Sequence, residues 1–517
     1  MDKQNIVSRR EFLKAAGVTG ASLAAAGCSI ESFFHPTASN SKLKGRPNVL
    51  VIKSDEHNPF ISSVEKHPFV KTPNMQHMAD NGTYYKSHYC PSPLSQPSRS
   101  AYQAGKRAHE IQVYNNCGIF HFDYPSYGQV LREQGVYTVH IGKVDSYQAA
   151  EKLGFSEMHR LNWDSVRDPG DLNFGRKPLT VRPLENYQGI PRHTLYGLKK
   201  DAYKKDEPSF ALAKEWIKTK GTSLDKPWVM EINTSKPHFP MQSTKEFWDM
   251  YEGHDDLPEH DKYAESAQHP FSKDLRAHFQ TDKFPESSIR GLRRGYYANV
   301  SYLDRKIGEV IDVLKENGLL ENTIIVYTSD HGEMLGKFGM WWKSSLYDDS
   351  ARVPCIVCGP GFDKGIVDNT AVDQFDLLAS IFHAVGAKLP EDWSGDAMQT
   401  LEQNDDKHTA FCEYHGHGVR ASGYVLRRGR WKYIYNCDAP NQLFDIETDP
   451  QETKDVIAKH PNLAKDLHQD LLKYCDPEVE NQRTEAFIAK QFEAVKNDPD
   501  LEFLDGGHAV RKGATMH

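Results

Sequence analysis

The stretch Asn48-Val49-Leu50-Val51-Ile52-Lys53-Ser54-Asp55-Glu56 decides the fold class of this chain. Its apolar run, residues 48–52, is continuous rather than alternating, which is typical of a strand buried on both faces of a parallel sheet. Similar strands are predicted farther along the chain, at residues 136–141, 228–233, 323–328 and 353–357. Helical segments separate them, so the pattern up to about residue 390 predicts an open α/β sheet with its site at the carboxyl ends of the strands.

The predicted helices cover residues 73–81, 98–104, 124–134, 211–218, 289–317 and 374–385. The clearest is 289–317, whose apolar stripe recurs at helical spacing at Val300, Leu303, Ile307, Ile311 and Leu314. Two long polar insertions, 150–205 and 242–285, interrupt the alternation, and we expect the first to help shape a substrate cleft.

The character of the chain changes after about residue 394. Residues 424–435 form two alternating strands around a glycine-containing turn, and helical sequence follows at 461–474. This pattern predicts a smaller antiparallel α+β unit. We therefore divide the folded part into a catalytic α/β domain, residues 47–393, and a C-terminal α+β subdomain with its tail, residues 394–517.

Composition narrows the class of protein. The 517 residues carry a net charge of −8, so a generic nucleic-acid partner is not expected, although a local basic pocket can still take an anionic substrate. Eight cysteines include the pair Cys355 and Cys358. No second such pair follows, so we interpret these two as small strand residues rather than zinc ligands.

The N-terminus has the features of an export signal. Ser8-Arg9-Arg10-Glu11-Phe12-Leu13-Lys14 precedes an Ala-rich stretch that is too short to span a bilayer. We interpret residues 1–28 as a twin-arginine signal peptide rather than an amphipathic helix, and 29–46 as a linker. Cys28 resembles a lipoprotein cleavage site, and both lipidation and cleavage without a lipid remain open. The prediction is a bacterial protein exported by the twin-arginine translocase to the periplasm or cell surface, with no membrane attachment except a lipid at Cys28.

The run Ser95-Gln96-Pro97-Ser98-Arg99, followed by Gly105-Lys106-Arg107, carries the functional signal. Alone, such a run is typical of a surface loop. However, the acidic clusters Asp55-Glu56 and Asp330-His331 each follow an apolar strand, and carboxylates there suit a hard cation. Further polar residues lie at other strand ends, namely Lys143, His238 and Lys343.

Together these motifs resemble the sulfatase family, whose pattern is Cys or Ser, any residue, Pro, any residue, Arg. The resemblance runs from about residue 47 to 453. It implies an alkaline phosphatase/sulfatase-like large mixed sheet flanked by helices, with a smaller C-terminal antiparallel domain. It also implies that Ser95 is oxidised to formylglycine (3-oxoalanine) and lies at the start of a helix, whose positive end suits a sulfate anion. The implied ligands of calcium, or alternatively magnesium, are Asp55, Glu56, Ser95, Asp330 and His331.

The resemblance assigns further roles. Arg99 would hold the hydrated aldehyde, Lys143 and Lys343 would bind sulfate oxygens, and His238 would protonate the leaving alcohol. Many sulfatases continue Gly-Lys-Trp-His, whereas this chain has Gly142-Lys143-Val144-Asp145. Asp145 would then orient a neighbour or contact substrate. The variant resembles a branch that includes a lysosomal glucuronate 2-sulfatase.

The C-terminal motif Glu413-Tyr414-His415-Gly416 resembles the end of the same branch, and also that of choline sulfatases. His415 and His417 are predicted to bind substrate, with a hydrogen-bonded structural pair as the alternative.

The predicted activity is that of a sulfuric ester hydrolase. We expect an exported sulfatase that acts on a sulfated polysaccharide or its oligosaccharides, containing uronic acid, through attack of the formylglycine hydrate on sulfur. A serine at position 95 implies an anaerobic-type sulfatase-maturating enzyme as partner, acting before export. The alternatives are a choline- or other small-ester sulfatase, a phosphatase or phosphodiesterase of the same superfamily, and a non-catalytic glycan-binding lipoprotein.

Overall fold

The computed structural model describes residues 45–118, 122–161, 172–176, 189–504 and 508–511. The predicted signal peptide, Cys28 and nearly all of the linker lie outside these residues, as does much of the first insertion. Within the described ranges, no helix has both the length and the apolar character needed to cross a membrane.

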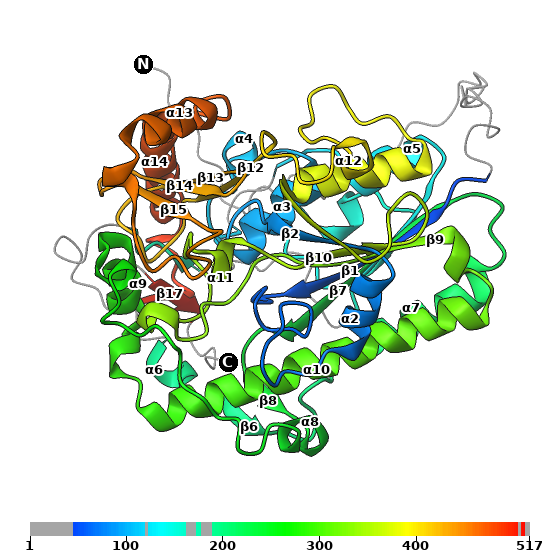
Figure 1. Cartoon of the computed structure of the whole chain (residues 1–517), viewed down its shortest axis with the longest axis horizontal. Helices are drawn as coiled ribbons and strands as arrows, with labels where there is room; N and C mark the ends of the chain where they lie inside the picture. The colour runs from blue at the N-terminus through cyan, green and yellow to red at the C-terminus, as the bar shows by residue number, and fades with distance from the viewer. Residues whose placement is uncertain (1–44, 119–121, 162–171, 177–188, 505–507, 512–517) are drawn as a thin grey trace, which may run out of the picture. The chain divides into compact units, whose positions relative to one another are not determined.

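A mixed sheet of eight strands forms the centre of the fold, in the order β11-β2-β10-β9-β1-β7-β3-β4 (Figure 1). Its neighbouring strands are parallel except at β10, which runs antiparallel to both β2 and β9. The strands are β1 (Asn48–Asp55), β2 (Thr83–Tyr89), β3 (Tyr137–Gly142), β4 (Glu157–His159), β7 (Trp228–Pro237), β9 (Thr323–Ser329), β10 (Cys355–Cys358) and β11 (Ile366–Asp373).

Helices cover both faces of this sheet. One face packs against α3 (Ser95–Ala104), α5 (Tyr127–Glu133) and α12 (Gln374–Val385). The other packs against α2 (Pro73–Asp80), α7 (Glu207–Trp216) and the long α10 (Glu286–Glu316).

Strand β1 explains why its sequence is apolar without alternation. Val49 and Val51 join the core under α12, whereas Leu50 and Ile52 join the core under α10. All four side chains are buried, because a strand between two helical layers has no face left for water. Replacing Leu50 or Ile52 by alanine would cost about 2–5 kcal/mol of stability.

Helix α3 starts earlier than the predicted Ser98. Leu94 is its N-cap in extended backbone, and the first helical bond runs from the Ser98 amide to the Leu94 carbonyl at 3.0 Å. Pro97 falls in the first turn, where an amide has no intrahelical acceptor, so the proline does not delay the helix. Ser95 is therefore the first helical residue.

Strands β2 and β11 were absent from the sequence prediction. Strand β2 reads Thr-Tyr-Tyr-Lys-Ser-His-Tyr, which has neither a continuous apolar run nor strict alternation. Its polar members Ser87 and His88 are nevertheless buried, and Ser87 is covered by the C-terminal unit, which packs over this edge of the sheet and brings Arg427 Nη2 within 3.5 Å of Ser87 Oγ. The mixed polar and apolar sequence of β2 therefore depends on the C-terminal unit, which lies far away in the chain.

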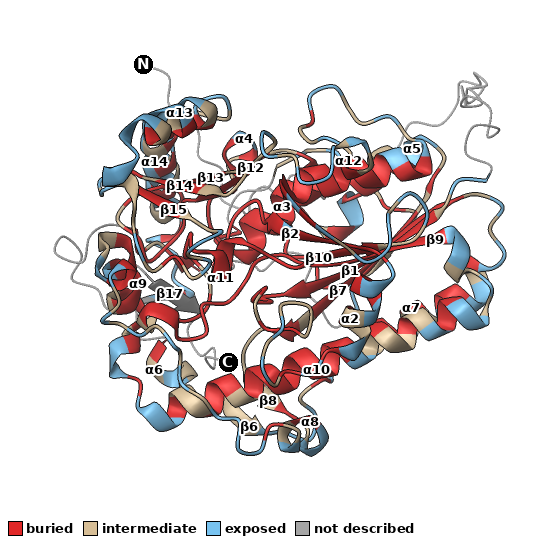
Figure 2. Ribbon diagram, in the orientation of Figure 1, coloured by how far each residue is buried: buried red, intermediate tan, exposed pale blue. Residues whose placement is uncertain are grey.

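A second sheet, antiparallel and four-stranded, has the order β12-β13-β14-β15 and packs with α13 (Pro461–Leu471). Its strands are β12 (Thr409–Tyr414), β13 (Gly423–Arg428), β14 (Trp431–Asn436) and β15 (Gln442–Asp445), so the predicted hairpin over 424–435 is confirmed. Helix α14 (Pro477–Val495) follows. The inner sides of these helices are buried and their outer sides exposed (Figure 2).

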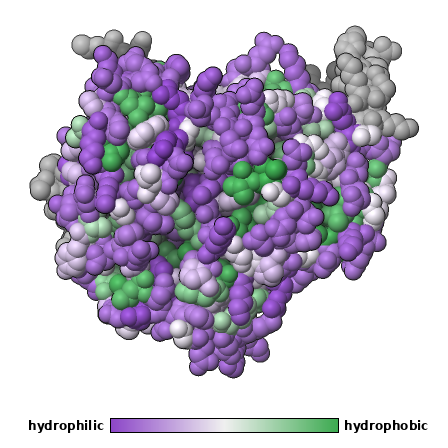
Figure 3. Space-filling view, in the orientation of Figure 1, coloured by the Kyte–Doolittle hydropathy of each residue, from purple (hydrophilic) through white to green (hydrophobic). Residues whose placement is uncertain are grey.

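The remaining described elements are short. They include the strand pair β6 (Tyr196–Leu198) and β8 (Met241–Ser243), the three strands β5 (Leu172–Asn173), β16 (Leu501–Leu504) and β17 (His508–Arg511), and the helices α4 (Ala108–Ile111), α6 (Gly189–Arg192), α8 (Lys245–Asp249), α9 (Pro270–Phe279) and α11 (Asp348–Ala351). The face seen in Figure 3 is mainly hydrophilic, and its apolar atoms gather in small, separate patches.

Candidate active site

The predicted site residues come from the carboxyl ends of neighbouring strands and from the start of α3. Asp55 ends β1, Asp330 and His331 follow β9, and Lys143 follows β3. His238 follows β7, and Lys343 lies in the loop that leads to α11. Parallel strands bring these ends to one edge of the sheet, which is the usual ligand position in an open α/β fold.

Ser95 lies at the centre of this group. Its side chain is buried, and its Oγ is 3.0 Å from His331 Nε2. As the first residue of the ten-residue helix α3, it lies at the positive end of the helix dipole. An anion bound beside Ser95 is therefore stabilised by the helix as well as by side chains.

Asp55, Asp330 and His331 form the first candidate metal cluster. One donor atom from each lies within 4.8 Å of the others. His331 Nδ1 donates to the Gly332 carbonyl at 3.0 Å, which leaves the Nε2 lone pair facing the cluster. Burial lowers the His331 pKa to about 4, so the imidazole is neutral and able to bind a cation.

Two buried carboxylate oxygens in this region, Asp55 Oδ1 and Glu56 Oε1, receive no hydrogen bond from an N–H or hydroxyl donor, and Glu56 lies beside the buried carboxyl group of Glu333, which adds to the effect of burial in raising the pKa of Glu56. Burying such an atom is unfavourable unless a ligand supplies the missing contact. Burial alone would raise the pKa of Asp55, but Lys143, His238 and Arg99 outweigh it and hold that pKa well below its usual range. An ionised carboxylate with an open oxygen fits a divalent cation.

Glu56 belongs to a different subset of the site. Its Oε2 is 3.2 Å from His238 Nε2 and 3.5 Å from Lys343 Nζ, and the second candidate metal cluster consists of Asp55, Glu56 and His238. Its backbone has a φ of 68°, and its amide donates to Asp330 Oδ1 at 3.1 Å. Burial raises the pKa of Glu56 well above its usual value.

Arg99 links the carboxylates beneath Ser95. Its Nε donates to Asp330 Oδ2 at 2.7 Å, and its Nη1 donates to Asn233 Oδ1 at 2.7 Å. Asn233 was not among the predicted site residues. It lies within β7, and its position at the end of the predicted strand 228–233 was the available signal.

Three cationic or imidazole groups surround the site. Lys143 Nζ forms ion pairs with Asp55 and, at 2.9 Å, with Asp145. Lys343 Nζ is 2.7 Å from His238 Nε2. Burial, and then the positive charges of Lys343 and Lys143, lower the pKa of His238 well below its usual value. Asp145 therefore contacts Lys143, one of the predicted site residues, which agrees with the prediction that it orients a neighbour.

The histidines of the C-terminal unit are placed differently. His415 is buried, with Nδ1 2.8 Å from Ser422 Oγ and Nε2 2.8 Å from Glu413 Oε2. Both ring nitrogens are thus engaged within the protein, which favours the structural alternative for this residue. His417 is also buried, and its ring centroid lies 5.8 Å from that of Phe279, which itself packs on Trp342 beside Lys343.

Comparison with known proteins agrees with this geometry. The family model for sulfatases matches residues 47–387, and the model for the C-terminal part of N-sulphoglucosamine sulphohydrolase matches residues 336–476. The chain belongs to the sulfatase family. It is therefore a sulfuric ester hydrolase with the alkaline phosphatase/sulfatase fold, and members of this family generally use a formylglycine residue and a divalent metal ion.

Relatives of the sulfatase cover most of its length. A choline-sulfatase of Rhizobium meliloti is 31% identical over 81% of this chain and 83% of its own. Arylsulfatase K of Bos taurus is 28% identical over 82% of this chain and 81% of its own. Among solved structures, a 2-O GAG sulfatase has a TM-score of 0.63 and 20% identity, covering 88% of this chain and 93% of its own.

Proposed function

We propose that this sulfatase is an exported enzyme that removes sulfate esters from a uronic-acid-containing sulfated polysaccharide or its oligosaccharides, using formylglycine at position 95. The observation that carries the mechanism is Ser95 itself, buried at the start of α3 and 3.0 Å from His331 Nε2. Once residue 95 is formylglycine, its hydrate supplies the hydroxyl that attacks sulfur.

A divalent cation, calcium in our proposal and magnesium as the alternative, would be held by Asp55, Asp330 and His331. Glu56 and residue 95 are the further predicted ligands. The open Asp55 Oδ1 and the neutral His331 support this assignment. When bound, the cation supplies Lewis-acid stabilisation for negative charge on sulfate oxygens.

The remaining side chains orient the ester and manage its charge. Lys143 pairs with Asp55 and Lys343 lies 3.5 Å from Glu56, so both ammonium groups are placed to donate to sulfate oxygens. Arg99 neutralises the acids under the nucleophile through its 2.7 Å bond to Asp330.

His238 is the proposed acid for the leaving alcohol. Its Nδ1 donates to the Phe239 carbonyl at 2.7 Å, so the proton to be delivered must reside on Nε2. Lys343, 2.7 Å away, opposes that protonation. A bound sulfate offsets the Lys343 charge and so raises the pKa of His238 when the substrate is present.

The substrate class rests on three supports. The relatives include Arylsulfatase K and a 2-O GAG sulfatase, the predicted leader at residues 1–28 suits an extracellular polymer, and Asp145 replaces the usual histidine. Because residue 95 is serine, maturation would require an anaerobic-type sulfatase-maturating enzyme in the cytoplasm, before the twin-arginine translocase exports the folded protein.

A second candidate substrate is choline sulfate or another small ester. The observation that favours it is the 31% identity to the choline-sulfatase of Rhizobium meliloti. Such a substrate would need an aromatic or acidic site for the quaternary ammonium group.

The test is sulfate release by protein coexpressed with the maturating enzyme, on sulfated uronic-acid oligosaccharides, sulfated hexosamines and choline sulfate. Ser95→Ala is the control, and mass spectrometry reports formylglycine at residue 95. We expect release from the uronic-acid members only. Release from choline sulfate alone would replace the proposed substrate, and activity that persists in Ser95→Ala would overturn the mechanism.

A further inference from the structure

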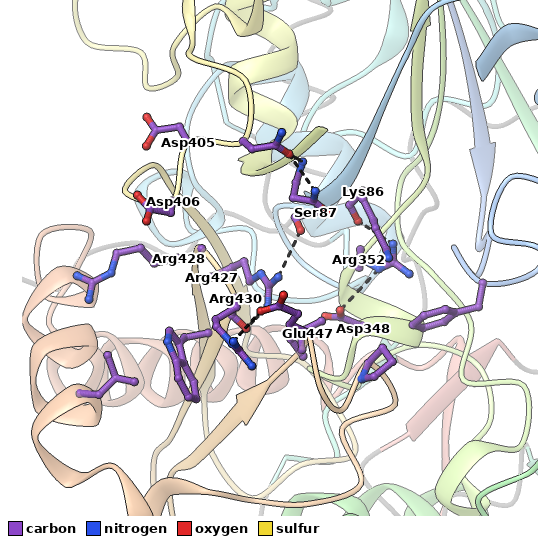
Figure 4. Close-up of a pocket in the computed structure, with 18 residues that line it drawn as sticks. Lys86, Ser87, Asp348, Arg352, Asp405, Asp406, Arg427, Arg428, Arg430 and Glu447 are labelled. Atoms are coloured by element: carbon purple, nitrogen blue, oxygen red, sulfur yellow. Dashed lines mark hydrogen bonds and ion pairs between the residues drawn. The ribbon is translucent and has the colours of Figure 1, made fainter. Parts of the chain in front are cut away.

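A cavity of about 670 Å³ lies between the main sheet and the β13–β14 hairpin of the C-terminal sheet (Figure 4). Its walls come from β2, from α11 and from the hairpin, and none of the site residues described above lines it. A volume of this size is in the usual range for small-molecule sites. It is therefore a separate candidate binding site.

Arg427 forms part of the cavity wall, and only 5% of this residue is exposed. Its Nη1 donates to the Arg430 carbonyl at 3.0 Å, and its Nη2 is 3.5 Å from Ser87 Oγ. Its Nε has no hydrogen-bond partner. Figure 4 shows this side chain between Ser87 and Arg430.

The other arginines of the cavity differ from Arg427 because each has a carboxylate partner. Arg428 pairs with Asp466 at 2.6 Å, Arg430 with Glu447 at 2.7 Å and Arg352 with Glu65 at 2.8 Å. Within the described residues, no carboxylate lies at ion-pair distance from Arg427. Asp348 attracts it at longer range, but that carboxylate is bonded to Lys432 Nζ at 2.7 Å and to the Tyr89 hydroxyl at 2.9 Å.

A buried guanidinium without an acid is unfavourable unless an anion reaches it. Its planar donors suit a carboxylate or sulfate oxygen pair. Lys86, an exposed residue of β2, adds a second positive charge to the same cavity.

The rest of the lining indicates what carries the anion. Trp431 offers a flat apolar surface, and Asn369, Asn404 and Asp405 offer groups that pair with hydroxyls. Asp405 and Asp406 lie away from Arg427 in Figure 4. Their negative charge disfavours the binding of a small ligand that carries several negative charges close together. The lining therefore fits a ligand that carries one acidic group beside several neutral hydroxyls, and an acidic sugar is such a ligand.

We propose that this cavity is an ancillary glycan site, in which Arg427, Lys86 and Ser87 bind the carboxylate or sulfate of one sugar unit of an oligosaccharide. The choice of ligand rests on the proposed action on sulfated glycans. The site would retain an oligosaccharide or polymer on the enzyme at a place separate from the scissile ester.

The experiment is a calorimetric titration of the Ser95→Ala protein, which cannot consume its ligand, with a sulfated glucuronate-containing tetrasaccharide. In this background we compare three variants. Arg427→Gln and Lys86→Glu change residues of the cavity, and Lys218→Gln is the control, because Lys218 is exposed and does not line the cavity. Thermal unfolding checks that each protein is folded. If Arg427→Gln does not fold, Lys86→Glu decides the result.

We expect Arg427→Gln to lower the number of bound tetrasaccharides by one, or to weaken one binding event at least 10-fold. Lys86→Glu should weaken the same event at least 5-fold, and Lys218→Gln should change nothing. Loss of one bound tetrasaccharide can be measured whether or not the catalytic site also binds this sugar. An incorrect proposal for the substrate can therefore be distinguished from an incorrect proposal for this cavity. Unchanged binding in folded Arg427→Gln and Lys86→Glu overturns the inference, as does equal binding of inorganic sulfate alone or of maltotetraose.

Discussion

The molecule contains two buried clusters of charge that differ in how completely their atoms are paired. The first, which we propose to be catalytic and call the catalytic cluster, consists of Asp55, Glu56, Arg99, Lys143 and Asp330, and its Asp55 Oδ1 has no hydrogen-bond partner. The second cluster, which we call the ionic clasp, consists of Glu65, Asp348, Arg352, Lys432 and Glu452.

The charged groups of the clasp pair with one another. Lys432 Nζ is bonded to Asp348 at 2.7 Å and to Glu452 at 2.5 Å, and the other Glu452 oxygen accepts from the Asp348 amide at 2.6 Å. These bonds join α11 of the main fold to β14 of the C-terminal sheet. The carboxylates of the clasp are thus paired as folded, although Arg352 Nε has no hydrogen-bond partner and lies 3.6 Å from Asp348 Oδ2, whereas the catalytic cluster retains an open carboxylate oxygen that suits a bound cation.

Asp55→Asn should have the largest effect on activity and, when unfolding is measured without divalent cations, only a small one on stability. The amide removes the open anionic oxygen, while Arg99 keeps Asp330 and Asn233, and Lys143 keeps Asp145. We expect sulfate release to fall at least ~1,000-fold, on the order of the loss of a principal catalytic group. Ion chromatography of released sulfate measures the fall, and urea unfolding measures stability. Activity within 10-fold of the unsubstituted protein would contradict the role of Asp55.

Lys432→Met should have the opposite pattern. It leaves Asp348 and Glu452 buried without their shared cation, which costs about 3–5 kcal/mol when one partner of a buried pair is removed. Urea unfolding gives the free energy, and Lys432→Met combined with Glu452→Gln should recover part of it. A stability unchanged by Lys432→Met would show that the clasp does not hold the two sheets together.

Removal of divalent cations should affect the catalytic cluster only. Chelation is expected to abolish sulfate release and to lower stability by about 2.7 kcal/mol relative to a cation present at 100 times its Kd. Added calcium or magnesium should restore both, and calorimetry with each ion identifies the preferred one. Asp55→Asn serves as the control, because its unfolding temperature should not respond to chelation.

The smallest effect is expected at Glu413, whose carboxylate is fully paired like those of the clasp. Burial would raise its pKa, but His109 and the hydrogen bonds from His109 and His415 outweigh burial and hold the pKa far below its usual value. Because the folded-state pKa is depressed, its stabilisation is present above the ordinary value of 4.5 and is lost as the pH falls below it.

Glu413→Gln should therefore destabilise the protein by about 2 kcal/mol at pH 6, with a difference that shrinks below pH 4. Denaturation measured at several pH values gives this profile. A difference that is constant across pH would mean that the loss arises from packing rather than from charge.

The sequence predicts the main features of the fold because its central strands are buried on both faces. The continuous run at 48–52 and the stripe of α10 both reflect burial that is local to one element. Strand β2 could not be recognised, because its buried Ser87 is covered by a sheet more than 300 residues later in the chain, with Ser87 and Arg427 in contact at 3.5 Å.

Much of the candidate site could be predicted for the same reason, since its side chains follow recognisable strands. The division between Asp55, which faces Asp330 and His331, and Glu56, which faces His238 and Lys343, depends on the positive φ of Glu56. No residue pattern specifies that backbone turn. Asn233 was missed because its place at the end of a predicted strand was the one available signal, and that signal alone does not show that the side chain accepts a hydrogen bond from Arg99.

The pairing of β1 has a consequence for synthesis on the ribosome. Strand β1 lies between β7 and β9, and Ser54 Oγ donates to the Thr328 carbonyl across 274 residues of sequence. The nascent chain therefore carries the apolar run 48–52 unpaired on one side until β9 has left the exit tunnel. Such distant pairing is slow and leaves an edge open to aggregation. This sheet can therefore form only late in translation, and protection of the early strand by a chaperone would favour a good yield of folded protein.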